Sequence, residues 1–499
     1  MIRREALVRA IVLALVAGAL RGGEPGLAAI LPAVPETVRV NVAGLGVSYA
    51  EIGSTGAMTA TAADGRVLYQ GQQRTLVRRN VRRAEGTIVQ LPPAKDGIAP
   101  EDRESRLELI REARRAASEP ALHIVTIPFE FSLLQGSSDP LGTPILSSDK
   151  IQTVAFRAEF GYLNFNGRLF RGTLEVTTDD EGDMIVVNTV RTADYLPSVI
   201  GAEEPSTWHP EALAAQAIAA RTYLVTHLAR HDHYDIEGDV RDQAYEGLGS
   251  EADSTRRAVE RTAGVVATYG GRPISALFSA NAGGITEDSE NVFANALPYL
   301  RSVPSPGDEL AKDSGFGRTS YEWNREFTAP QLGSYLAQRG INIGIPQRID
   351  VLQASPAGRP TLVRITGDRG TKDIGKDQGR YYFGLKSNLF KVRMVPGGGL
   401  EWVSYRDTVR IMDMEVLGSK LVGTTFERVL NSDRELVSLR TTGYVYELPD
   451  RFVFDGKGFG HSVGMSQWGA QGMALRGSDY EQILKHYYQG IELTNIGGA

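Results

Sequence analysis

Two adjacent glutamates, Glu203 and Glu204, precede an Ala-rich segment and have the residue type needed for acid–base chemistry. A carboxylic acid can protonate a departing oxygen when apolar or anionic surroundings raise its pKa. Trp208 can supply an apolar wall, and the second glutamate can disfavour ionisation of the first by like-charge repulsion. The alternative is that both glutamates cap the following helix or face solvent. The spacing to Trp208, Gln216 and Arg221 favours Glu203 as a catalytic acid.

A second segment with chemical potential lies near the other end of the chain. Residues 456–470 read GKGFGHSVGMSQWGA and combine a histidine, a glutamine and a tryptophan with closely spaced glycines. Polar side chains and aromatic faces are the groups that grip glycans in an open groove. We therefore expect this segment and the Glu203 segment to converge on one groove, although they are distant in sequence.

The candidate substrate contacts come from both segments and from the region between them. They are Gln216, Arg221, Tyr245, Ser279, Asn281, Gly283, Gly284, His461, Gln467 and Trp468. The two glycines would let the backbone approach a ligand. Structural roles remain open for several candidates: a buried salt bridge for Arg221, a core position for Trp468, and a turn-stabilising contact for His461.

The number of acids near Glu203 bears on the mechanism. Ordinary glycosidases use two carboxylates at a fixed separation. No second acid stands out near Glu203 apart from Glu204, Asp239 and Asp242. A single-acid mechanism fits this pattern better.

The two segments together resemble the SpoIID/LytB family, the stage II sporulation protein D type of peptidoglycan lytic transglycosylase. The similarity is carried by residues 195–223, YLPSVIGAEEPSTWHPEALAAQAIAARTY, and continues through Gln243 to Gly247 and residues 456–470. It implies that Glu203 protonates the bond between N-acetylmuramic acid and N-acetylglucosamine and then acts as base on the C6 hydroxyl, leaving a 1,6-anhydro end. LytB-type relatives are described as amidase enhancers. The alternatives are therefore a non-catalytic partner of a cell-wall amidase and a cell-wall glycan-binding protein.

The one cluster of metal-ligand residue types is His227, His231 and His233 with two nearby aspartates. His227 and His231 have the i, i+4 spacing that can hold zinc on a helix. Some relatives in the family bind zinc nearby through cysteines, but this chain has none. We expect no cofactor and a solvated polar turn here, with zinc as the alternative.

Composition limits the class of protein. The net charge is −6 and the basic residues are dispersed, so we expect no nucleic-acid partner. Residues 1–29 carry Arg3, Arg4 and Arg9 before an apolar run of about ten residues, which predicts a signal peptide or N-terminal anchor and an extracytoplasmic protein. A buried N-terminal helix is the alternative.

The pattern along the chain predicts an α+β protein with mixed, mainly antiparallel sheets and flanking helices around an open glycan groove. We expect a β-rich module over 38–170 with a charged helical insertion at 101–118, a catalytic core over 171–306, an inserted β-rich domain over 307–450, and a C-terminal segment, 451–499, that completes the core. Helices are expected from Pro210, over 252–262 and over 329–339, and hairpins at 173–189 and 265–279.

Overall fold

The computed structural model describes residues 33–44, 47, 49–71, 75–80, 130–135, 146–148, 153–178, 184–228, 230–315, 317–430, 434 and 436–497. The chain divides into two compact units. One comprises Met1–Val38, Arg191–Arg230 and Asp239–Ala499, and the other comprises Arg39–Val190 and His231–Gly238. The expected signal segment, 1–29, and charged insertion, 101–118, lie outside the described residues.

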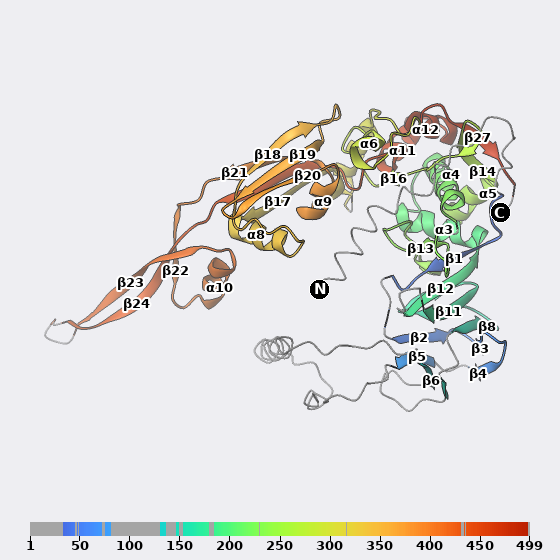
Figure 1. The fold of residues 1–499 in the computed structure, drawn as a ribbon, viewed down its shortest axis with the longest axis horizontal. Coiled ribbons are helices and arrows are strands. Elements are labelled where there is room, and N and C mark those ends of the chain that lie inside the picture. The colour runs from blue at the N-terminus through green and yellow to red at the C-terminus, as the bar shows by residue number, and fades with distance from the viewer. Residues whose placement is uncertain are drawn as a thin grey trace. The chain divides into compact units, whose positions relative to one another are not determined.

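The unit formed by Arg39–Val190 and His231–Gly238 is built on two sheets. The first has the order β13-β1-β12-β11-β8-β3-β4, and the second β10-β9-β2-β5-β6-β7 (Figure 1). Their strands are β1 Thr37–Asn41, β2 Tyr49–Ser54, β3 Met58–Ala62, β4 Val67–Gly71, β5 Thr75–Asn80, β6 Glu130–Gln135, β7 Leu146–Ser148, β8 Val154–Ala158, β9 Leu163–Phe165, β10 Arg168–Phe170, β11 Thr173–Thr178, β12 Met184–Arg191 and β13 Ile236–Glu237. Strands β1 and β13 pair in parallel. The pairs β12–β11, β11–β8, β8–β3 and β3–β4 of the first sheet and the pairs of the second sheet are antiparallel.

The other unit begins with helices that carry the candidate site. They are α3 Thr192–Glu203, α4 Pro210–His227, the 3-10 turn η1 Gly247–Ser250 and α5 Asp253–Arg261. Helix α4 starts where the sequence predicts, because proline suits the first turn and the ring of His209 accepts a hydrogen bond from Glu211 N at 3.3 Å. Helix α4 is buried on nearly every face. Its many alanines permit this close packing on all sides.

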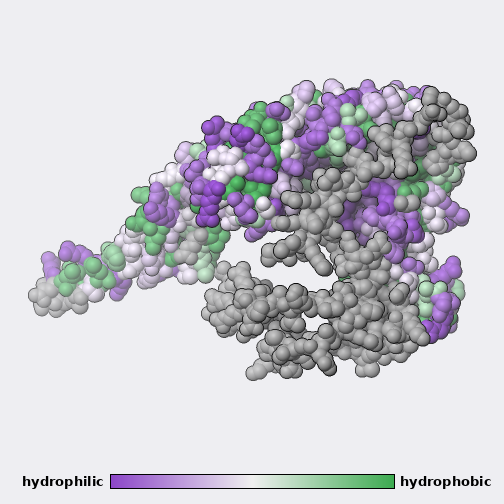
Figure 2. Space-filling view, in the orientation of Figure 1, coloured by the Kyte–Doolittle hydropathy of each residue, from purple (hydrophilic) through white to green (hydrophobic). Residues whose placement is uncertain are grey.

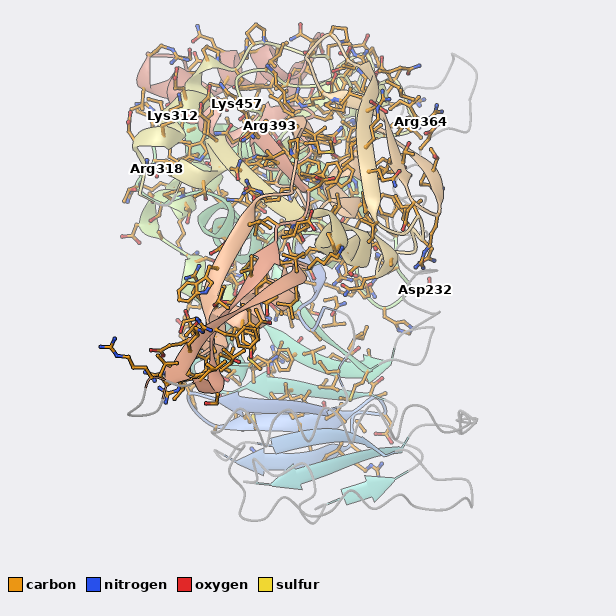
Figure 3. The ribbon with its side chains drawn as sticks, turned by 90° about the vertical axis from the view of Figure 1, so that its left-hand side faces the viewer. Asp232, Lys312, Arg318, Arg364, Arg393 and Lys457 are labelled. Atoms are coloured by element: carbon orange, nitrogen blue, oxygen red, sulfur yellow. The ribbon has the colours of Figure 1, made fainter. Side chains whose placement is uncertain are left out.

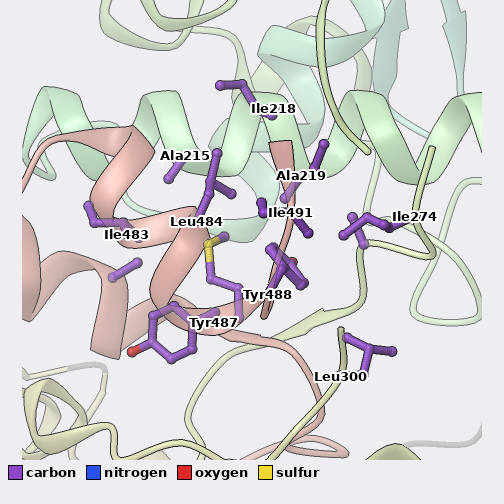
Figure 4. Close-up of a cluster of buried hydrophobic side chains, with 14 of the residues drawn as sticks. Ala215, Ile218, Ala219, Ile274, Leu300, Ile483, Leu484, Tyr487, Tyr488 and Ile491 are labelled. Atoms are coloured by element: carbon purple, nitrogen blue, oxygen red, sulfur yellow. The ribbon is translucent and has the colours of Figure 1, made fainter. Parts of the chain in front are cut away.

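The core around α4 joins segments from both ends of this unit. Ala215, Ile218 and Ala219 pack with Ile483 and Leu484 of α12 Tyr480–Tyr487 (Figure 4). Helix α11 Gln467–Leu475 and strands β14 Val265–Tyr269 and β27 Glu492–Asn495 contribute to the same unit. Each fully buried Ile or Leu contributes about 1.5–3 kcal/mol to folding. The C-terminal segment is therefore part of the core that positions the site.

Residues 306–457 supply the remaining elements. They are η2 Pro306–Asp313, α7 Arg318–Tyr321, β17 Glu322–Thr328, α8 Ala329–Ala337, β18 Pro346–Ala354, β19 Pro360–Gly367, β20 Gly370–Gly375, α9 Gln378–Tyr382, β21 Leu389–Val395, β22 Leu400–Ser404, α10 Thr408–Val416, β23 Lys420–Leu430, β24 Leu436–Glu447 and β25 Arg451–Lys457. The strands form sheets in the orders β17-β25-β21, β18-β19-β20 and β22-β24-β23. Large apolar side chains are exposed along the last of these sheets, including Trp402 at 52% and Phe426 at 53%. Hydrophobic residues, in green, reach the surface in this part of the chain (Figure 2).

The fold class is confirmed: helices and mainly antiparallel sheets occur together. The hairpin of β11 and β12 and the helices α5 and α8 form as expected, although the turn at 179–183 lies outside the described residues. The expected second strand at 274–279 is wrong in part. Of the residues that follow the turn, Arg272–Pro273 form β15 and pair with β14. Further along, β16 Phe278–Ser279 pairs in parallel with β26 Met465–Ser466. Chain reversal at Gly270-Gly271 is thus followed by a change of sheet. The five-part domain division remains a prediction.

Candidate active site

Glu203 lies at the last position of α3 and is half-buried. The backbone N–H of Ala244 donates to its Oε1 at 2.9 Å, and Nε2 of Gln467 donates to its Oε2 at 3.2 Å. Burial raises the pKa of the carboxyl, and the two hydrogen bonds oppose that rise because they favour the charged form. The result is a carboxylic acid that is both held in place and easier to keep protonated than an ordinary glutamate.

The C-terminal segment delivers Gln467 to this carboxylate. Strand β26 pairs with β16 through Met465 and Ser466, and helix α11 begins at the next residue. The N–H of Trp468 also donates to Ala280 O at 3.1 Å. The predicted convergence of Glu203 and Gln467 is therefore present in the structure.

Glu204 differs sharply from its neighbour. It is 2% exposed, and neither carboxylate oxygen has a hydrogen-bond partner in the part of the chain that the structure describes. Burial, and then the charge of Glu203, raise its pKa well above the ordinary value. A buried carboxylate without partners is costly as an anion, so Glu204 is neutral where Glu203 titrates.

Two residues that the sequence analysis did not select support the Glu203 site. Gln243 accepts a hydrogen bond from the hydroxyl of Tyr195 at 3.0 Å and donates to Ala220 O at 3.2 Å. Its neighbour Ala244 is the residue that binds Glu203. Gln243 therefore fixes the loop that holds the acid. The segment Gln243–Gly247 that contributed to the family resemblance contained this signal.

Gln216 and Arg221, two predicted substrate contacts, lie in the interior. Both are fully buried in α4. Arg221 donates to Val259 O at 3.2 Å, to Thr262 Oγ1 at 3.3 Å and to Val265 O at 3.1 Å, so it connects α4 to the end of α5 and the start of β14. Burial lowers its pKa to about 10. The structure gives Arg221 a packing role, and its partners are hydroxyl and carbonyl groups in place of the salt bridge considered above. The side-chain amide of Gln216 has no partner among the described residues.

Tyr245 and Trp468 are also largely buried, at 2% and 8% exposure. The ring of Tyr245 packs against Tyr195 at a centroid distance of 5.1 Å. The ring of Trp468 meets Trp208 edge-on at 4.8 Å. Trp208 and Trp468 therefore lie next to each other, and Gln467, which precedes Trp468, donates to Glu203.

The loop containing Ser279, Asn281, Gly283 and Gly284 is held by short-range and distant contacts. Asn281 is fully buried and donates to Asp308 O at 3.0 Å, while its backbone forms a bridge with Phe459. Gly284 N donates to Asp308 Oδ2 at 2.9 Å. Gly283 has φ of 75°, and an added Cβ would come within 3.0 Å of Leu389 and Lys457. The glycine at 283 is thus required by backbone geometry and packing.

His461 lies close to this loop. Its Nδ1 accepts from Val463 N at 3.0 Å, and its ring meets Phe293 edge-on at 5.6 Å. Ser462 N donates to Ser279 Oγ at 3.2 Å, which connects the two segments. Burial, and then the charge of Arg380, lower the pKa of His461 to about 3. The imidazole is therefore neutral at ordinary pH.

Basic side chains gather on the surface near the end of β25. Lys312 and Lys457 lie 4.9 and 5.2 Å from the centroid of the Tyr321 ring (Figure 3). Lys386 lies 5.9 Å from the ring centroid of Phe459, which is itself 48% exposed. Phe459 bridges to Asn281, so this cationic and aromatic surface adjoins the 279–284 loop.

The histidines considered for zinc have other contacts. His227 stacks on Tyr223 at 3.7 Å, and its Nδ1 lies 2.7 Å from Tyr223 O. His231 stacks on Tyr234 at 4.3 Å. Within the described part of the chain, no group of three or more His, Cys, Asp or Glu side chains is arranged to hold a metal ion. Whether zinc binds remains untested.

An open hollow of about 350 Å³ lies elsewhere, between α8 and the residues that follow α10. It is lined by Pro330, Gln331, Ser334, Tyr335, Gln338, Val416 and Gly418. None of these residues contributes to the Glu203 site. The expected glycan groove stays a prediction.

Comparison with known proteins identifies the region around Glu203. Residues 180–269 match the family model SpoIID, described as stage II sporulation protein. This region of the chain, which includes Glu203, is therefore similar to the SpoIID family. An uncharacterized protein of Brachyspira hyodysenteriae is 28% identical over 345 residues, which cover 68% of this chain and 76% of that protein. Stage II sporulation protein D of Bacillus subtilis is 27% identical over 325 residues, which cover 62% of this chain and 76% of that protein.

A third similar protein is the amidase enhancer of Bacillus subtilis. It is 28% identical over 313 residues, which cover 60% of this chain but only 40% of the relative. The resemblance to the SpoIID/LytB family drawn from residues 195–223 and 456–470 is thereby confirmed.

Among the described residues, no helix has both the length and the apolar character needed to cross a membrane.

Proposed function

We propose that this protein acts on the bacterial cell wall as an extracytoplasmic peptidoglycan lytic transglycosylase. The SpoIID domain and relatives named stage II sporulation protein D and amidase enhancer support a role at the cell wall. The observation that carries the chemistry is the state of Glu203. It is a half-buried acid with a raised pKa whose two oxygens are oriented by Ala244 and Gln467.

The proposed reaction uses Glu203 twice. Its protonated carboxyl donates a proton to the oxygen between N-acetylmuramic acid and N-acetylglucosamine as the C1–O bond breaks. The resulting carboxylate takes the proton from the C6 hydroxyl of the muramic acid while that oxygen bonds to C1. The acid returns to its starting state, no water is consumed, and the product carries a 1,6-anhydro ring. One acid is sufficient for both steps, and Glu204, which is neutral and largely buried, is not required to ionise.

The surface next to the 279–284 loop suits a sugar polymer that carries carboxylates. Exposed Phe459 offers an aromatic face, and Lys386 offers positive charge beside it. Lys312 and Lys457 add positive charge that is partly balanced, because both pair with Glu322 and Lys312 also pairs with Glu309. We assign this surface to the glycan strand and its acidic substituents.

Mass spectrometry of muropeptides released from purified peptidoglycan tests the proposal. The full-length protein should produce new 1,6-anhydromuramic acid ends, and the Glu203→Gln variant should not. Reducing ends that have added water would indicate a hydrolase instead. Absence of any product would contradict the enzymatic proposal.

The second candidate is a non-catalytic amidase enhancer, favoured by the relative of that name. This function predicts no new glycan ends from the protein alone. It predicts faster stem-peptide release when a cell-wall amidase is added, with equal stimulation by the wild type and by Glu203→Gln. The two functions therefore give different results in the same pair of variants.

A further inference from the structure

Asp308 is a buried carboxylate that belongs to none of the motifs selected from the sequence. It is fully buried in η2 and accepts hydrogen bonds from Ala282 N at 3.1 Å and Gly284 N at 2.9 Å on one oxygen. Its other oxygen accepts from the hydroxyl of Ser466. Its backbone carbonyl accepts from the side chain of Asn281. Asp308 thus holds both the 279–284 loop and Ser466, the residue that precedes Gln467.

Ser466 occupies the N-cap position of α11 but does not cap the helix with its side chain. A serine at this position normally accepts a hydrogen bond from the first turn. Here the hydroxyl donates to Asp308 and accepts from Ala282 N at 3.2 Å. The start of α11 is therefore oriented by a contact outside the helix.

The backbones of η2 and α11 approach closely enough to make this contact. A Cβ added to Gly307 would come within 2.8 Å of Gly469 O and 2.9 Å of Gly472 Cα. Only glycine permits such an approach without displacement of one element. Asp308 follows Gly307 directly, so its carboxylate reaches the start of α11.

We propose that Asp308 is a positioning residue that, through Ser466, sets Gln467 against the carboxylate of Glu203. The chain of contacts runs from Asp308 to Ser466, then along the backbone to Gln467, and then to Glu203 Oε2 at 3.2 Å. Asp308 itself does not contact the reacting atoms. The consequence for catalysis rests on the proposed function, whereas the consequence for the pKa of Glu203 does not.

The neighbours of Asp308 allow its influence to be separated from a simple charge effect. Burial lowers the pKa of Arg359 and raises that of Tyr487, and the charge of Asp308 favours a higher pKa at both. Its carboxylate accepts hydrogen bonds from Ser305, from Ser466 and from the backbone amides of Ala282 and Gly284. Removing a negative charge would lower the pKa of a nearby carboxyl. Losing the hydrogen bond from Gln467 would raise the pKa of Glu203. The two mechanisms therefore predict opposite shifts.

The test measures the pKa of Glu203 by NMR with ¹³C-labelled glutamate carboxyls, the signal being assigned by its absence in Glu203→Gln. Asp308→Asn should raise this pKa in the otherwise wild-type chain. It should cause no further rise when Gln467 is already replaced by methionine, because the hydrogen bond is then gone. This non-additivity is what a shared path requires. A fall in the pKa, no change, or the same rise in both backgrounds would overturn the proposal.

Ser466→Ala keeps the test decisive if Asp308→Asn does not fold. It removes the contact between Asp308 and the start of α11 while leaving the two loop amides bound to Asp308, and it should raise the pKa of Glu203 in the same way. Ser289→Ala is the matched control: among the described residues, the hydrogen bonds of this buried hydroxyl are to residues 290–301, so the pKa of Glu203 should not move. An equal shift in the control would assign the effect to general loosening.

The same variants separate the positioning role from the proposed function. If the wild type releases 1,6-anhydro ends, Asp308→Asn should lower kcat by a factor of about ten and leave KM nearly unchanged, which corresponds to about 1.4 kcal/mol in the transition state. A rise in KM with unchanged kcat would overturn the positioning role. If the wild type releases no product, the proposed function fails while the NMR result still decides on Asp308.

Discussion

Gln467 donates a hydrogen bond of 3.2 Å to Glu203 across 264 positions of the sequence. The amide approaches a carboxylate that burial already makes easier to protonate. The contact places the C-terminal segment within the acid's immediate surroundings. Variants of this site can measure how far the hydrogen bond lowers the pKa of Glu203.

Replacing Glu203 by glutamine should abolish release of 1,6-anhydro ends while changing the melting temperature little. The amide keeps the shape of the side chain but has no proton to transfer. Product analysis and thermal unfolding check the two parts. Turnover retained in Glu203→Gln and lost in Glu204→Gln would assign the chemistry to Glu204.

Replacing Gln467 by methionine should lower kcat about tenfold and shift the alkaline limb of the pH–rate profile to higher pH. The hydrogen bond lowers the pKa of Glu203, so its loss lets burial raise that pKa further. Glu203 must be protonated to act as the acid, and the higher pKa extends the protonated form upward in pH. Gln489→Met, at a half-buried amide whose donated bond is to His486 O, is the control. An unchanged profile in Gln467→Met would show that the contact does not influence the acid.

Replacing Glu204 by methionine should stabilise the protein at pH 8 by about 1–3 kcal/mol. The folded-state pKa of Glu204 is raised, so the native state holds a proton that the unfolded state releases above pH about 4.5. Stability is therefore full below that pH and is lost as pH rises toward the folded pKa. Chemical denaturation at several pH values should show this slope in the wild type and a weaker slope in the variant. Equal slopes would contradict the assignment of a neutral, buried Glu204.

Replacing His461 by alanine should lower activity about tenfold or more without unfolding the protein, because Nδ1 orients the turn next to the 279–284 loop. The pKa of His461 is lowered to about 3, so the unfolded state gains a proton below pH 6.5 that the native state does not. His461→Asn should therefore weaken the loss of stability between pH 6.5 and 3. Full activity in His461→Ala would limit this residue to folding.

Replacing Arg221 by methionine should cost about 3 kcal/mol of stability and leave the KM of the folded fraction unchanged. The change removes the guanidinium that donates to Val259 O, Val265 O and Thr262 Oγ1 in the interior. Denaturant unfolding and steady-state kinetics on the same preparation check both parts. A large rise in KM with normal stability would restore Arg221 as a substrate contact.

Local pattern determined much of the secondary structure. The start of α4 at Pro210, the β11–β12 hairpin and the helix α8 follow from proline geometry, strand propensity and turn residues, which act over a few positions. The assignment of Glu203 also came from spacing within one short stretch, 195–223, because that stretch carries the family resemblance.

Tertiary structure alone decided which polar residues approach Glu203. Gln216 and Arg221 share the predicted stretch but are turned into the interior, since α4 is surrounded on nearly all faces. Asp308 carries no distinguishing pattern, yet it holds the 279–284 loop. Gln243 appeared in the sequence only as part of the segment 243–247, and the structure alone shows that it fixes the loop that binds the acid. Periodicity reports which face of an element is apolar, but not which distant element covers it. The packing of distant segments determines which element covers which face. The close approach of Gly307 in η2 to Gly469 in α11 is one instance.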